Sequence, residues 1–166
     1  VTPMNACGPP VPGSVLYTIN AAPTAVAGGD ATICESNNTY QLQSTVANEN
    51  LIAWTSTGSG SFDNVNTEDP IYTLSPGDKT SGSVSFTVTG TQAGCAAASD
   101  TMVLTIQKNP IANAGTTLQI CEGESITISS AAAQFSNTTN WTQSGGLGTF
   151  INTSSLAPTY NSVLGE

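Results

Sequence analysis

The sequence predicts an all-β protein made of tandem β-sandwich domains in an extended array. Three observations support this. The chain repeats itself with a period of about 87 residues, apolar residues alternate with polar ones along short segments, and clusters of Gly, Pro, Asn and Ser separate those segments. Helical spacing of apolar residues is not sustained anywhere. Self-similarity at a fixed spacing is typical of repeat proteins, in which each copy packs against its neighbours.

Matching residues define the phase of the repeat. Trp54 and Trp141 are 87 positions apart, whereas Tyr72 and Tyr160 are 88 apart, because the second copy has one additional residue between its Trp and its Phe. The period divides the chain into three parts. We expect the C-terminal strand of a preceding repeat at residues 1–22, a complete repeat at 23–109 and the N-terminal part of a following repeat at 110–166.

The strands of the complete repeat follow from alternation. One predicted strand spans residues 40–46, where apolar residues share one face. Ile126 and Ile128 repeat this pattern in the second copy. The next strand, at residues 52–54, places Ile52 and Trp54 inward.

Two longer strands follow at residues 84–88 and 102–106, in each of which three apolar residues alternate with intervening ones. Turns are expected where Gly, Pro and Ser accumulate, at 58–60, 75–78 and 90–94. About seven short strands in one repeat, with a Trp on the third, indicate an immunoglobulin-like sandwich.

The charge balance excludes several kinds of partner. Eleven acidic residues face only Lys79 and Lys108, the chain has neither Arg nor His, and its pI is near 4.1. A surface of this sign repels nucleic acid and anionic membranes. The sequence contains no apolar run near the roughly 20 residues that a membrane-spanning helix needs, so we expect no membrane insertion.

The residue types also argue against catalysis. Without His, neither a Ser-His-Asp nor a Cys-His set can form. Asp63, Glu68, Asp69 and Asp78 could supply a glycosidase pair, but they fall in predicted turns, where solvated loop charges are the simpler interpretation. Calcium bound by Asp63, Asp69 and Asp78 is an alternative that the pattern leaves open. We therefore expect no enzyme, no cofactor and no assigned metal site.

Trp54 and Trp141 have two interpretations. Exposed aromatic rings stack on sugars in carbohydrate-binding modules, whereas an immunoglobulin-like sandwich places a Trp in its core. The strand pattern turns both residues inward, so we expect them to pack in the core.

Several strings resemble one family. Residues 25–35, 53–55, 60–62, 70–72 and 100–106 (AVAGGDATICE, AWT, GSF, PIY and DTMVLTI) resemble the PKD-like, immunoglobulin-like tandem repeats of large secreted surface proteins and adhesins of the Bacteroidota. The resemblance covers essentially the whole chain. It implies an extracellular, cell-surface location and a place in a stalk, filament or adhesin. It also implies an O-glycosylation candidate at Thr101, because Asp100-Thr-Met102 matches the modification pattern of such proteins.

The four cysteines predict disulfides, because an acidic, His-free extracellular chain uses paired thiols in this way. Cys34 and Cys121 follow the first strand of their copies, whereas Cys7 and Cys95 lie in the loop before the last strand. In a sandwich of this topology these positions lie at opposite ends of one domain, so we expect each cysteine to pair with a cysteine of an adjacent repeat. A Cys34–Cys95 bridge through a bent loop is the alternative.

Two functions fit the sequence. The first is a non-enzymatic structural repeat that acts as a stiff spacer, and the second is an adhesive module whose exposed loops bind a glycan, a protein or a host surface. The loops at 56–60 and 144–148 differ between copies, which favours the spacer. Its partners would be neighbouring repeats of the same polypeptide or identical subunits, to which residues 14–19 could donate a strand.

Overall fold

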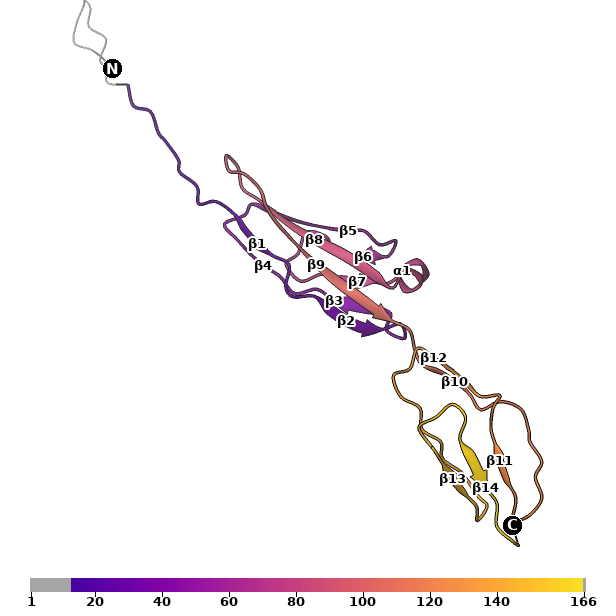
Figure 1. The fold of residues 1–166 in the computed structure, drawn as a ribbon. Helices are drawn as coiled ribbons and strands as arrows, with labels where there is room; N and C mark the ends of the chain where they lie inside the picture. The colour runs from indigo at the N-terminus through magenta and orange to yellow at the C-terminus, as the bar shows by residue number, and fades with distance from the viewer. Residues whose placement is uncertain (1–12, 166) are drawn as a thin grey trace, which may run out of the picture.

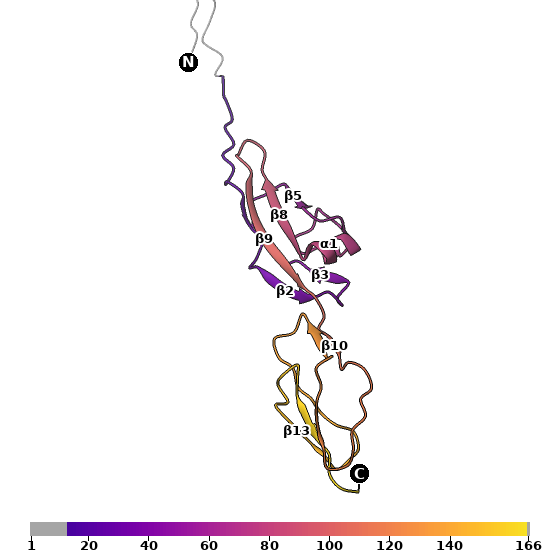
Figure 2. The same cartoon turned by 45° about the vertical axis from the view of Figure 1, so that its right-hand side comes forward.

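The structure is a computed structural model and describes residues 13–165. Its strands form two sets that lie one after the other along the chain (Figure 1), and the turned view in Figure 2 shows the same arrangement. We call residues 24–107 the first unit and residues 111–161 the second unit. Within residues 13–165, no sheet joins a strand of one unit to a strand of the other. The prediction of an all-β fold is confirmed.

The first unit contains nine strands and one short helix. They are β1 (Thr24–Val26), β2 (Ala31–Cys34), β3 (Thr39–Gln41), β4 (Thr45–Ala47), β5 (Leu51–Ser56), β6 (Ser61–Phe62), β7 (Ile71–Thr73), α1 (Pro76–Ser81), β8 (Ser83–Thr91) and β9 (Ala98–Gln107). The second unit contains β10 (Ile111–Asn113), β11 (Ser125–Thr127), β12 (Ala132–Gln134), β13 (Thr149–Ile151) and β14 (Thr159–Asn161).

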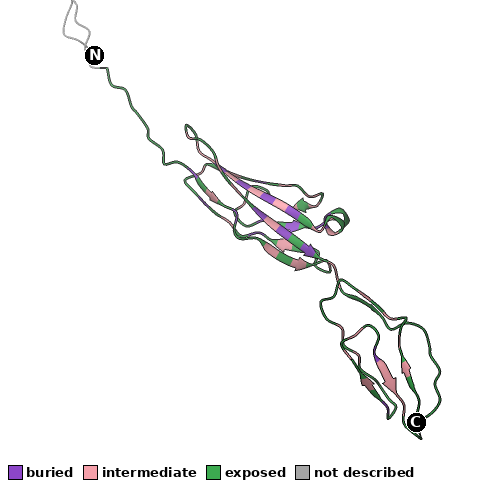
Figure 3. Ribbon diagram, viewed as in Figure 1, coloured by how far each residue is buried: buried purple, intermediate pink, exposed green. Residues whose placement is uncertain are grey.

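The first unit is a sandwich around one apolar core. One layer is a four-stranded sheet in the order β2-β9-β8-β5, and the other combines the β3-β7-β6 sheet with the β1-β4 pair. All pairings are antiparallel except that of β2 with β9, which is parallel. Buried residues alternate along β8 and β9, as Figure 3 shows. This period of two is what the sequence predicted for these strands.

Three aromatic rings join the two layers at the centre of the core. Tyr72 of β7 lies edge-on to Phe86 of β8, with ring centroids 4.7 Å apart. Phe62 of β6 contacts Tyr72 at 5.0 Å and Phe86 at 5.9 Å. Edge-to-face packing at these distances is the favoured geometry for aromatic pairs.

The second unit repeats part of this arrangement. Phe150 and Tyr160 lie 5.1 Å apart on paired strands, close to the 5.0 Å between Phe62 and Tyr72. The β10–β12 pair also repeats the register of the β1–β4 pair, displaced by 87 residues at both ends. The sequence period is therefore also a period of strand pairing.

The strand predicted at residues 40–46 is wrong in its extent. It is two strands: β3 pairs with β7, and β4 pairs with β1. Two carboxylates cause the break by accepting hydrogen bonds from amides near it. Asp69 accepts from Ser44 N at 2.9 Å, and Glu68 accepts from Val46 N at 3.1 Å.

The turn predicted at residues 75–78 is the start of helix α1. Ser75 caps the helix, because its Oγ accepts a hydrogen bond from Asp78 N while the Asp78 carboxylate accepts one from Ser75 N. Pro76 follows at the first helical position, where it loses no helical hydrogen bond. This capping box stabilises a six-residue helix that has no apolar stripe to reveal it.

A matched pair of leucines tests the position of the core. Leu104 in β9 is fully buried, whereas Leu51 in β5 is 66% exposed. We expect Leu104→Ala to lower the free energy of unfolding by about 2–5 kcal/mol, because it leaves a cavity. Leu51→Ala should change it by less than about 0.5 kcal/mol. Urea titrations of both variants measure the difference, and equal effects would contradict this placement of the core.

Candidate functional site

The acidic residues of the first unit serve mainly as acceptors for backbone amides. Asp63 accepts from Ile71 N at 2.8 Å, and Asp30 accepts from Val103 N at 2.8 Å. Together with the contacts of Asp69 and Glu68 described above, these bonds occupy the carboxylates that the sequence offered for catalysis or calcium. Among the described residues, no group of three or more His, Cys, Asp or Glu is arranged to hold a metal ion.

Asp78 forms a separate, buried network. Its side chain is 2% exposed. Its Oδ1 accepts from Ser59 N at 2.8 Å, and its Oδ2 accepts from Ser75 N at 2.9 Å and from the Tyr72 hydroxyl at 3.1 Å. The Tyr72 oxygen in turn accepts from Gly60 N at 2.8 Å. A side chain at Gly60 would collide with the Tyr72 ring, so this approach requires glycine.

The network controls the ionisation of Asp78. Burial by itself would raise the pKa of Asp78, but the amides of Ser75 and Ser59 and the Tyr72 hydroxyl together outweigh burial and lower the pKa. A buried carboxylate with this many donors is ionised and structural. The sequence predicted a solvated loop charge at Asp78. The Ser75-Pro76 pair before it was the available signal for its capping role.

The two tryptophans occupy equivalent places. Trp54 is 3% exposed, and its indole N–H donates to Thr67 O at 3.2 Å. Trp141 is half-buried, and its indole N–H donates to Ser155 O at 2.9 Å. Both rings therefore pack against their own unit, in an arrangement unlike an open sugar-stacking platform.

Thr101 lies on the exposed face of β9. Its hydroxyl is 2.8 Å from that of Thr87 on β8. The neighbouring Asp100 carboxylate accepts from Ala27 N at 2.9 Å, and this bond, with one from the Thr101 amide, lowers the pKa of Asp100. Asp100 therefore has a structural role, whether or not Thr101 carries a glycan.

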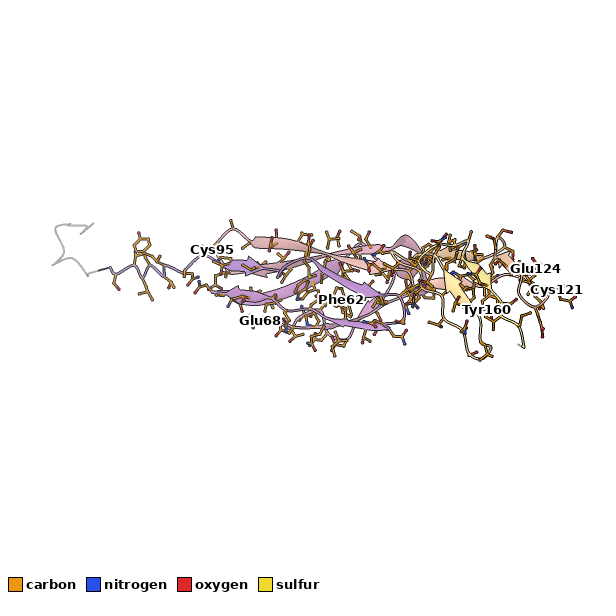
Figure 4. All side chains as sticks on the ribbon, turned by 60° about the horizontal axis from the view of Figure 1, so that its bottom comes forward. Phe62, Glu68, Cys95, Cys121, Glu124 and Tyr160 are labelled. Carbon is orange, nitrogen blue, oxygen red and sulfur yellow. The ribbon has the colours of Figure 1, made fainter. Side chains whose placement is uncertain are left out.

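The described cysteines lie at the ends of the units, and none is bonded to another. Cys34 is the last residue of β2, opposite Gln107 at the end of β9. Cys95 lies in the loop between β8 and β9, where its Sγ is 3.8 Å from Asn20 O. Figure 4 shows Cys95 near the N-terminal segment and Cys121 at the far end of the second unit. Cys7 lies outside the described residues.

The segment between the two units is held by the end of β2. Glu35 forms an ion pair with Lys108, with 3.0 Å between Oε2 and Nζ, and its Oε1 accepts from Asn109 N at 3.0 Å. Lys108 Nζ also donates to Lys79 O at 2.8 Å. The Asn109 amide and the Lys108 cation lower the pKa of Glu35. Three polar contacts thus connect this short linker to the first unit.

A hollow of about 390 Å³ lies in the second unit, lined mainly by alanines, threonines and Trp141. No titratable side chain lines it. In the first unit β8 covers the equivalent position, where Gly90 packs closely on Val46. No strand within residues 111–161 takes that place. The hollow is therefore uncovered core and offers no chemistry of its own.

No family model and no curated protein matches the sequence. The solved structure of Sidekick-1 immunoglobulin domains 1–4 is similar over 86% of this chain and 41% of that one, at 16% identity and a TM-score of 0.52. The PKD domain of human KIAA0319 matches over 66% of this chain and 99% of its own, at 16% identity and a TM-score of 0.43. Protocadherin Gamma B7 extracellular cadherin domains 1–4 match over 88% of this chain and 43% of that one, at 11% identity and a TM-score of 0.43.

These likenesses concern the fold alone. The chain spans less than half of the Sidekick-1 structure, and that likeness agrees with the immunoglobulin-like sandwich predicted from the sequence. In the part of the chain that the structure describes, no helix is both long and apolar enough to cross a membrane.

The Asp78 network predicts a specific acid sensitivity. Because the folded-state pKa of Asp78 is lowered, ionised Asp78 contributes stability above its unfolded-state pKa, and this is lost as pH falls through the folded-state pKa. We expect Asp78→Asn to cost about 2–3 kcal/mol at neutral pH, since its amide group would face backbone donors. The variant should also lose less stability than the parent below about pH 4.

Urea titrations at neutral pH and below about pH 4 measure both effects. Glu49→Gln is the matched control, because Glu49 is not part of the network. If the free energy of unfolding falls equally with decreasing pH in Asp78→Asn and in the parent, Asp78 has no such role.

Proposed function

We propose that this chain is a non-catalytic structural repeat of an extracellular cell-surface protein, in which it acts as a stiff spacer within a stalk, filament or adhesin. In this proposal residues 23–109 form a complete repeat, residues 1–22 belong to the preceding repeat and residues 110–166 begin the following one. The observation that carries it is the shared period of 87 residues in sequence and strand register, in units that lie end to end.

The linker between the two units supports the proposal that the array is stiff. Only residues 108–110 separate the end of β9 from the start of β10. Glu35 binds both Lys108 and Asn109, and Pro110 restricts the backbone further. A linker this short, with its polar groups engaged, limits the angles available between units.

The sequence resemblance supports a cell-surface protein of the Bacteroidota as the source. The Sidekick-1 likeness is compatible with this setting, because that structure is itself a chain of four immunoglobulin domains. The adhesive alternative has less support in the first unit, where the loop carboxylates are occupied by backbone amides. The glycan at Thr101 remains a proposal from the resemblance alone.

Imaging tests the array directly. Electron microscopy of the native protein should show an extended particle with a spacing of roughly 40 Å per repeat, as expected from strand length and loops. A compact particle without a regular spacing would contradict the spacer function.

A linker variant tests the source of stiffness. We expect Glu35→Gln to increase the independent tumbling of the two units, because it removes the ion pair with Lys108 and weakens the contact with Asn109. Residual dipolar couplings of the two units measure their relative alignment. Glu49→Gln, whose side chain is remote from the linker, should leave the couplings unchanged, and an equal response of both variants would refute this role of Glu35.

A further inference from the structure

We propose that successive repeats are joined by a disulfide between the cysteine that ends β2 of one repeat and the cysteine in the β8–β9 loop of the next. Cys34 and Cys95 represent these two positions in the first unit. The inference deepens the proposed function and rests on it, because each bond requires a neighbouring repeat.

Cys34 is exposed, and it lies opposite Gln107 in the parallel pairing of β2 with β9. The amide of the next residue, Glu35, donates to Gln107 O at 2.8 Å. The thiol-bearing residue is therefore adjacent to the carbonyl at which β9 leaves the unit.

Cys95 lies at the opposite end of the unit. Its Sγ is 3.8 Å from Asn20 O and 3.7 Å from Ala21 O. The loop is held there by a hydrogen bond from Asn20 Nδ2 to Ala93 O at 3.0 Å. Cys95 therefore lies against the segment through which the chain enters the first unit.

A shift by one repeat period relates the end of β9, beside Cys34, to the chain segment that Cys95 contacts. Asn20 and Gln107 are 87 positions apart, so Asn20 occupies in the preceding repeat the position that Gln107 occupies in the first unit. Cys95 contacts the Asn20 carbonyl. In the preceding repeat, the counterpart of Cys34 lies beside this same carbonyl, as Cys34 lies beside the Gln107 carbonyl in the first unit. Two thiols, one from each repeat, meet at the same peptide group.

The same geometry excludes the internal bridge between Cys34 and Cys95. Cys34 is level with the last residue of β9, whereas Cys95 precedes its first residue, Ala98. The ten residues of β9 span about 33 Å. A disulfide requires Cα atoms within about 7 Å.

The bond forms by oxidation of two thiols. Two S–H bonds break, one S–S bond forms, and two electrons and two protons pass to an oxidised dithiol carrier, whose own disulfide is reduced to two thiols. Such exchange proceeds through attack of a thiolate on the carrier disulfide. The extracellular setting of the proposed function favours persistence of the product.

Peptide mapping of the native protein tests the linkage. Free thiols are first blocked with iodoacetamide without reduction. Digestion with glutamyl endopeptidase, under conditions that cleave after Asp and Glu, then places Cys34, Cys95 and Cys121 in the separate peptides 31–35, 79–100 and 101–122. We expect peptide 31–35 to be linked to a loop peptide of the following repeat, and peptide 79–100 to a β2 peptide of the preceding one.

Two results would overturn the proposal: a link between peptides 31–35 and 79–100, or full alkylation of Cys34 and Cys95. A Cys95→Ser variant of the native protein provides a second measurement. It should expose one additional thiol, on the preceding repeat, and leave the bond of Cys34 intact. Ser99→Ala, near the same loop, is the control and should expose none.

Imaging separates this proposal from the proposed function. Extended particles whose cysteines are all alkylated would reject the disulfide and leave the spacer role standing. Compact particles would reject the spacer role and, with it, the bond between repeats.

Discussion

Backbone amides that have no neighbouring strand to bond must find other acceptors, and the first unit depends on carboxylates to supply them. Seven acidic side chains accept from such amides: Asp30, Glu35, Asp63, Glu68, Asp69, Asp78 and Asp100. A carboxylate forms stronger hydrogen bonds to an N–H than a neutral acceptor does. This use explains how a chain with eleven acidic residues and two lysines keeps its loops ordered without a matching set of cations.

The same interaction explains where prediction from sequence succeeded and where it failed. Alternation identified β8 and β9, because their buried face is continuous and local. The break between β3 and β4 was missed because Glu68 and Asp69, which lie more than 20 residues away, determine it. Helix α1 was missed because its capping box, and no apolar periodicity, stabilises it.

The candidate site also contains features that the sequence predicts and features that it does not. The period places the cysteines in equivalent positions of successive copies, so their arrangement at the ends of the units could be predicted from the sequence together with the topology. Two contacts support the proposed bond between repeats: that of Cys95 with Asn20 and that of Glu35 with Gln107. Each contact joins residues that lie far apart in the sequence, so neither could be predicted from it. The burial of Asp78 could not be predicted from the sequence either, because Tyr72 and Gly60 approach it only in the folded sandwich.

The parallel pairing of β2 with β9 gives the first unit a place where tension acts along paired strands. Both strands run toward the second unit, so a pull on the outer ends of this pair draws Ala31 one way and Gln107 the other. The load then acts along the strands, in shear, and all four paired positions from Ala31 to Cys34 bear it together. An antiparallel hairpin pulled from its open end would instead lose its hydrogen bonds one after another, at a lower force.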